Sequence, residues 1–306
     1  MYGISTAWRS NETDDGNELI DLMLESGISS LELDYRITYE MLAQMKRRLF
    51  SGEITVLTIH NFCPIPQDIP KSKASGDLFL FSSLDEDERK LAVKYGLESI
   101  HLAADLEAGL VVYHFGTVDM EDEMEKLMDF YRAGKIDSEE ATTWLTKKLA
   151  ERQEKARPYF DAVLKSLDTL NKEAFRLGVL IGAENRYRYT QFPFKEEFDY
   201  IFREFAGGNI RYWHDVGHAE IFERLGLLDH EKDLLQRYKD HLAGMHIHDI
   251  LGVQDHLAPG HGDFRFEKLA PYLNDQSIRI LEVHSQASAD DMRESVDLLM
   301  EKNILP

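Results

Sequence analysis

The chain has little cysteine, no long apolar run and few basic residues. Cys63 is the single cysteine among 306 residues, so no disulfide can form within the chain, and this fits a reducing compartment. No apolar run approaches the roughly 18 residues that cross a bilayer, and no secretory signal follows Met1. We therefore expect a cytoplasmic protein that does not bind a membrane.

The scarcity of basic residues bears on the partners. Lys and Arg total 35 against 56 Asp and Glu, which gives a formal net charge of −21. Without a long basic stripe, such a surface repels the phosphates of nucleic acids, so we do not expect nucleic acid as a partner. The hydrophobic fraction of 43% and the charged fraction of 30% are typical of a globular chain.

Short apolar runs alternate with amphipathic segments along the whole chain. The predicted strands span residues 2–8, 30–35, 53–61, 109–116, 178–186, 210–216, 242–248 and 278–284. Helical spacing falls between them, at 17–27, 38–52, 197–208 and 289–303. Eight alternating units predict an α/β fold, a closed (β/α)8 TIM barrel formed by one domain over residues 1–306. The competing open, doubly wound sheet would need a glycine-rich phosphate loop after the first strand, and none is present.

The interval between the predicted strands 109–116 and 178–186 is too long for a simple connection. Residues 119–176 are highly charged and have helical spacing with a break near 134–135. We interpret them as a helical insertion after strand 4, a short helix followed by a long one. We expect a solvated helical hairpin rather than a substrate lid or a dimer arm. The irregular segment 61–83 follows a strand end, so we expect it to lie over the barrel mouth.

Acidic residues and histidines lie at the ends of the last four predicted strands, and in a barrel such ends converge. Glu184 closes the run GVLIGAE and is either a metal ligand or the partner of Arg186 in an ion pair. Asp215 and His218 form D-x-G-H. Asp215 could be a plain helix N-cap, but the histidine three residues on favours a metal site. His214 should point away by strand alternation.

The last two predicted strands also carry acidic residues or histidines at their ends. In GMHIHD, we favour His246 as the inner ligand, with His248 and Asp249 behind it or at the rim. Glu282 interrupts the apolar strand RILEV. Burying this charge would cost several kcal/mol without a metal or a cation such as Arg186.

Histidines also end two earlier strands and occupy a later loop. His60 ends VLTIH and His114 ends LVVYH, and each is as compatible with packing as with a site. His256 precedes the glycine-containing turn 259–262, which suits either a plain turn or a loop that folds over a ligand.

In their order and spacing, these clusters resemble the xylose-isomerase-like TIM-barrel superfamily. This superfamily contains sugar and keto-sugar epimerases and isomerases, inosose dehydratases and apurinic endonucleases (AP endonuclease family 2). The resemblance covers nearly the whole chain and is strongest over 178–284. For an epimerase or isomerase it implies one divalent metal ion, with Glu184, Asp215, His246 and Glu282 as ligands. Mn, Zn, Co or Mg would suit this set of carboxylates and imidazole. The resemblance also implies that both glutamates exchange protons with the substrate from opposite faces.

The apurinic endonucleases use three zinc ions and more ligands. Their extra histidines match His60, His114, His218 and His256. Gln254 stands where their remaining aspartate is expected, with Asp255 displaced by one position. One ligand of the third ion is therefore missing, and this favours the chemistry of a single ion.

We therefore expect a metal-dependent isomerase or epimerase that acts on a sugar or polyol-derived keto substrate by proton transfer through an enediolate. The predicted catalytic residues are Glu184 and Glu282. The predicted substrate-binding residues are His60, His114, Arg186, His218 and His256. The alternatives are a dehydratase of the same superfamily, a metal-dependent phosphodiesterase acting on abasic DNA, and a barrel that binds a sugar without turnover. A homo-oligomer is compatible with this reading.

Overall fold

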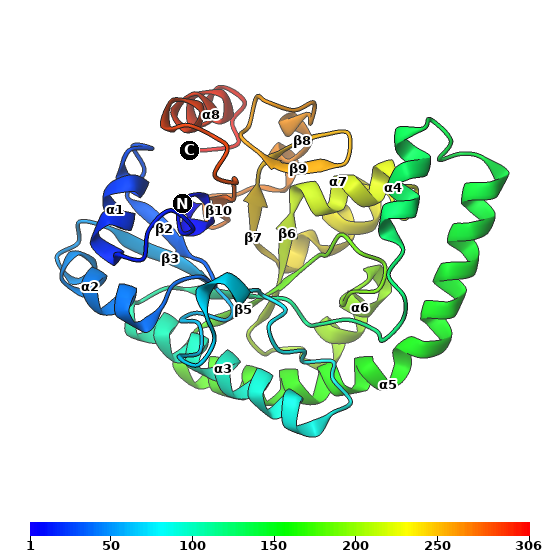
Figure 1. Cartoon of the computed structure of the whole chain (residues 1–306), viewed down its shortest axis with the longest axis horizontal. Coiled ribbons are helices and arrows are strands. Elements are labelled where there is room, and N and C mark those ends of the chain that lie inside the picture. Colours follow the sequence, from blue (N-terminus) through cyan, green and yellow to red (C-terminus); the bar gives the residue numbers. More distant parts are fainter.

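The computed structural model describes residues 1–306, and eight parallel strands form a closed barrel at its centre (Figure 1). In chain order the barrel strands are β1 (Tyr2–Ser5), β2 (Ser30–Leu33), β3 (Thr55–His60), β4 (Leu110–Tyr113), β5 (Leu180–Glu184), β6 (Ile210–Asp215), β7 (Leu242–Ile247) and β10 (Ile278–Leu281). All eight predicted strands and the parallel barrel are confirmed, although each strand is shorter than predicted. The open sheet is wrong, because β1 pairs with β10 and closes the ring.

Helices surround the barrel (Figure 1). They are α1 (Gly16–Leu24), α2 (Tyr39–Phe50), α3 (Glu86–Asp105), α4 (Met124–Arg132), α5 (Glu139–Leu177), α6 (Lys195–Glu204), α7 (Val216–Arg224) and α8 (Ala289–Glu301). The four helices predicted from their spacing are confirmed as α1, α2, α6 and α8. α3 and α7 were not predicted. None of the helices is both long and apolar enough to cross a membrane.

Two helices follow β4, as the charged interval predicted. The short α4 and the 39-residue α5 are separated near Gly134, whose φ of +65° is a conformation that glycine adopts readily. α5 packs along α3 on the outside of the barrel (Figure 1). The loop after β7 contains a further element that was not predicted, an antiparallel hairpin of β8 (Asp249–Leu251) and β9 (Gln254–Leu257).

Apolar side chains fill the inside of the barrel below its mouth. Leu110, Val112, Trp213, Ile278 and Ile280 form a small buried cluster there, separate from the larger core between strands and helices. Gly244 makes room for the indole, since a Cβ at this position would lie 2.6 Å from the Trp213 ring. Successive inward side chains are two residues apart on a strand. Trp213 is therefore followed inward by Asp215, and Ile280 by Glu282, so the next inward layer is polar and faces the mouth.

Candidate metal centre

A cavity of about 670 Å³ opens at the C-terminal mouth of the barrel. Its lining includes the predicted residues His60, His114, Glu184, Arg186, His218, His256 and Glu282. Ser75, Gly76 and Asp77 also line it, so the irregular segment lies over the mouth as expected. Arg132 of α4 reaches the cavity too. We expected a solvated hairpin, whereas α4 borders the cavity.

The four predicted metal ligands converge at the floor of this cavity. The side-chain donor atoms of Glu184, Asp215, His246 and Glu282 all lie within 4.8 Å of one another. Nδ1 of His246 is the common neighbour, at 3.0 Å from Glu184 Oε1, 2.9 Å from Glu282 Oε2 and 3.7 Å from Asp215 Oδ2. All four side chains are buried. The ends of β5, β6, β7 and β10 thus bring three carboxylates around one imidazole nitrogen.

The other ring nitrogen of His246, Nε2, faces a carboxylate that can hold the proton of the ring on this side. Nε2 lies 3.1 Å from Oε2 of Glu32, a fully buried carboxylate of β2 that also accepts the Thr58 hydroxyl at 2.8 Å. With the Nε2 proton donated to Glu32, the lone pair of Nδ1 faces three carboxylates. A lone pair and three anions repel one another unless a cation lies between them. The donor set therefore fits a divalent metal ion.

The pKa values indicate that a proton on His246 takes the place of this cation in the metal-free protein. Burial by itself would lower the pKa of His246, but Glu282 and Glu32 outweigh it and raise the pKa well above its ordinary value. Burial would raise the pKa of Glu184 and of Glu282. Arg186 and His114 hold the pKa of Glu184 well below its usual range, and His246 and His256 do the same for Glu282. His218 and His248 likewise lower the pKa of Asp215, so Glu184, Asp215 and Glu282 are ionised at neutral pH.

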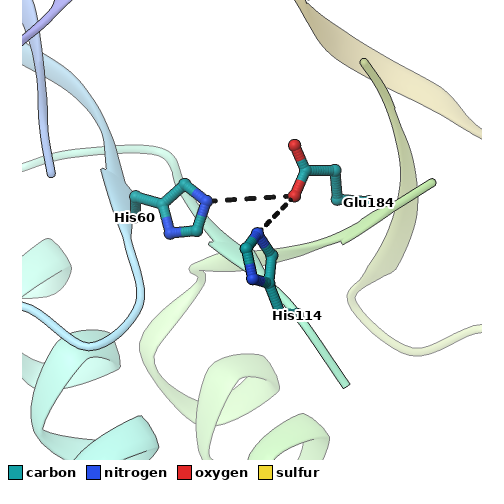
Figure 2. A group of neighbouring side chains, drawn as sticks. All are labelled: His60, His114 and Glu184. Carbon is teal, nitrogen blue, oxygen red and sulfur yellow. Dashed lines mark ion pairs between the residues drawn. The ribbon is translucent and has the colours of Figure 1, made fainter. Parts of the chain in front are cut away.

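A second group of donors shares Glu184 with the first. Figure 2 shows His60 and His114 pointing toward the same oxygen of Glu184, Oε2. Nε2 of His114 lies 2.8 Å from it and Nε2 of His60 lies 3.9 Å from it. The Nδ1 atoms are engaged elsewhere, with the Asn61 carbonyl at 3.0 Å and with Asp77 at 3.1 Å. In its neutral form each ring therefore carries its Nε2 lone pair on the side of Glu184.

Arg186 occupies this second group. Its Nη1 lies 2.7 Å from Glu184 Oε2 and 2.5 Å from His114 Nε2. The ion pair between Glu184 and Arg186 that the sequence left open is therefore present, but it is buried rather than at the rim. The expectation that Arg186 offsets the charge of Glu282 is wrong. His246 and His256 face Glu282 instead, because Arg186 points toward β4.

A third group contains Asp215, His248 and His256. Nδ1 of His248 accepts the backbone N–H of His256 at 2.9 Å, so its proton is on Nε2 and is donated to Asp215 at 3.1 Å. His248 thus has no lone pair for a metal and orients Asp215 instead, as predicted for a residue behind the ligands. Asp215 also caps α7, where it accepts the backbone N–H of His218 at 2.7 Å. Asp215 can therefore cap α7 and belong to the proposed metal site at the same time.

His218 lies beside the floor of the cavity with one nitrogen free. Its Nδ1 lies 3.1 Å from the Asn185 carbonyl, which leaves Nε2 as an acceptor. Burial lowers the pKa of His218 to about 4, so the ring is neutral at physiological pH. His214 points to the opposite face of β6, as predicted, where its Nε2 lies 2.9 Å from Nε2 of His230.

Several residues that position the site were not predicted. Asn185 holds the backbone of Asp215 by two hydrogen bonds of 2.8 and 2.9 Å. Glu32 carried a usable signal, since it interrupts the apolar strand SLEL as Glu282 interrupts its own strand. Asp77 carried none, because it lies in an irregular loop. Asp249, by contrast, was expected behind the ligands or at the rim. It accepts four backbone N–H groups of residues 250–264 and so shapes the loop that carries His256.

These features define a class of protein, a parallel (β/α)8 barrel with a candidate metal centre of carboxylates and histidines at its C-terminal mouth. The chain belongs to the xylose isomerase-like TIM barrel family, whose model matches residues 20–302. The predicted family is thereby confirmed. An uncharacterized protein of Methanocaldococcus jannaschii is 25% identical over 222 residues, which cover 72% of each chain.

Two solved structures of sugar epimerases have the same fold. The apo form of 3-keto-D-glucoside 4-epimerase from E. coli is 16% identical, has a TM-score of 0.66 and matches 98% of each chain. D-Allulose 3-epimerase from Methylomonas sp. is 11% identical, has a TM-score of 0.68 and matches 98% of this chain and 97% of its own. At such identities the likeness establishes the architecture.

Proposed function

We propose that the protein is a metal-dependent isomerase or epimerase that acts on a sugar or polyol-derived keto substrate. The observation that carries the proposal is the placement of two ionised glutamates on either side of His246 Nδ1, at 3.0 and 2.9 Å. Glu184 ends β5 and Glu282 follows β10, and β6 and β7 lie between these strands in the barrel. The two carboxylates therefore approach the cavity from different sides.

The floor of the cavity would hold the cofactor. Glu184, Asp215, His246 and Glu282 would bind one divalent ion, with Mn, Zn, Co or Mg suited to this donor set. When bound, the ion would act as a Lewis acid for adjacent oxygens of the substrate.

The residues of the chain would move the protons. One glutamate removes the proton from the hydroxyl-bearing carbon next to the carbonyl, which gives an enediolate. The other glutamate takes up a proton from solvent and gives it to the opposite face of that carbon or to the former carbonyl carbon. His218 Nε2 can accept a hydrogen bond from a substrate hydroxyl. Arg186 lines the cavity and can donate to a substrate oxygen. We assign His60, His114 and His256 to the wall that surrounds the substrate.

The experiment is a screen of keto-sugars with the metal-loaded protein in deuterated water. We expect deuterium at the reacting carbon, and Glu184→Gln and Glu282→Gln should each reduce turnover by several orders of magnitude. Metal content is measured in each variant, because a neutral amide is also a weaker ligand. Glu173→Gln, a surface change with the same chemistry, is the matched control.

The isotope result separates the mechanisms. Product without deuterium would contradict proton exchange through the glutamates and would indicate direct hydride transfer between neighbouring carbons. A dehydratase would share the first step but release water from the substrate, so a loss of the hydroxyl group identifies it.

A second candidate is a metal-dependent phosphodiesterase, and the group formed by His60, His114 and Glu184 favours it. Such chemistry uses more than one ion, to generate a hydroxide and to stabilise the leaving oxygen. The net charge of −21 opposes it, because a phosphate backbone would be repelled. A nicking assay on abasic duplex DNA, with the bound metal counted, tests this alternative. Efficient nicking would reverse our preference.

A further inference from the structure

The second donor group has the chemistry of a cation site, yet a side chain of the protein already fills it. His60 and His114 present Nε2 lone pairs to Oε2 of Glu184. Nη1 of Arg186 contacts two of these three donors, at 2.5 Å from His114 Nε2 and 2.7 Å from Glu184 Oε2. The Nη1 amino group therefore donates to two of the atoms that a metal ion would need.

Arg186 and a metal ion cannot both occupy the group formed by His60, His114 and Glu184. A metal ion bound to the same nitrogen and oxygen would lie about 2.1 Å from each, in the space that Nη1 fills. The guanidinium is always charged, so it also repels a divalent ion at this range. The arginine side chain is held in place, since it is only 4% exposed and its Nη2 lies 3.6 Å from Asp77 Oδ2.

We propose that Arg186 is a built-in cation that keeps the His60–His114–Glu184 group free of metal. The chain then binds a single ion, at Glu184, Asp215, His246 and Glu282. Arg186 also lines the cavity, so its guanidinium then binds a substrate oxygen beside the position that a second ion would have taken. This inference rests on the proposed function and makes it more specific, because a centre of one ion suits proton transfer better than phosphodiester cleavage.

A matched control is two residues further along the chain. Arg188 also lines the cavity, but it forms its ion pair with Asp122 rather than with a residue of either donor group. Its removal should therefore alter the charge of the cavity without opening the second group.

The test counts metal ions per chain. The protein is stripped with a chelator, reloaded with Zn²⁺, dialysed and analysed for metal and protein. We expect about one ion in the unaltered protein, about two in Arg186→Met and about one in Arg188→Met. The double variant Arg186→Met with His60→Ala should return to about one ion. Circular dichroism and thermal unfolding show whether each variant is folded.

Each other outcome overturns a specific statement. Two ions in the unaltered protein, with one lost in His60→Ala, would overturn the role of Arg186 but leave the proposed function in place. A folded Arg186→Met with one ion would do the same. No bound ion in any variant would contradict the proposed function itself. If Arg186→Met does not fold, the single variant His60→Ala decides the question. One ion per chain in His60→Ala, as in the unaltered protein, supports the inference. A fall from one ion to none in this variant overturns it.

Discussion

Glu32 offers a sharp test of the metal centre, because His246 is the only one of the four proposed ligands that it contacts. Its carboxylate is fully buried and accepts the Nε2 proton of His246 at 3.1 Å. Glu32→Gln keeps the size of the side chain but removes the charge and introduces an N–H₂ group. The imidazole could then place its proton on Nδ1, the nitrogen that faces Glu184, Asp215 and Glu282, where a metal needs a lone pair.

The expected loss of metal affinity follows from the contact between Glu32 and His246. Loss of a partner that orients a metal-bound histidine typically reduces metal affinity about 10- to 100-fold, or about 1.4 to 2.7 kcal/mol. We expect the upper end for Glu32→Gln, because the carboxylate has no exposure to solvent. The pKa of His246 in the metal-free protein should also fall, since Glu32 helps to raise it.

The assay is a competition for Zn²⁺ against a chelating dye. Thr58→Val is the matched control, because it removes the hydroxyl that donates to Glu32 at 2.8 Å but leaves the carboxylate facing His246. It should weaken binding less than Glu32→Gln. Thermal unfolding of the metal-free variants shows that both are folded. An affinity of folded Glu32→Gln within about twofold of the unaltered protein would refute the orienting role.

Three further results are expected. The pKa of Glu220 is lowered to about 2, since the hydrogen bond to His230 and nearby cations outweigh burial, so its carboxylate stabilises the fold above its unfolded pKa. Glu220→Gln should therefore lower the free energy of unfolding by up to about 3 kcal/mol at neutral pH, and the difference should disappear as pH falls from about 4.3 to about 2, measured by urea unfolding. Cys63 is fully buried and burial raises its pKa, so a thiol reagent at pH near 8 should label only the unfolded protein. Chelation of the bound metal should lower the melting temperature and re-addition should restore it, because three carboxylates around His246 would lose their cation.

The local chemistry of the sequence was enough for the fold, and the family resemblance added the set of four proposed metal ligands. Strands buried on both faces must be nearly continuous apolar runs, so all eight could be located without knowledge of their partners. Parallel closure then places the ends of consecutive strands at one mouth. Glu184, Asp215, His246 and Glu282 could be placed at this mouth because each interrupts or ends such a run, and the resemblance then implied that they bind one ion.

Contacts between strands remote in the sequence were decided only by the tertiary structure. Barrel closure places Glu32 of β2 behind His246 of β7, and no spacing along the chain encodes that approach. The partner of Arg186 depends on the direction of a long side chain, which turns toward His114 and away from Glu282. The proton position on His248 depends on a backbone N–H in the hairpin of β8 and β9. Apolar periodicity reports which face of an element is buried, whereas hydrogen bonds between distant elements follow from how these faces meet in space.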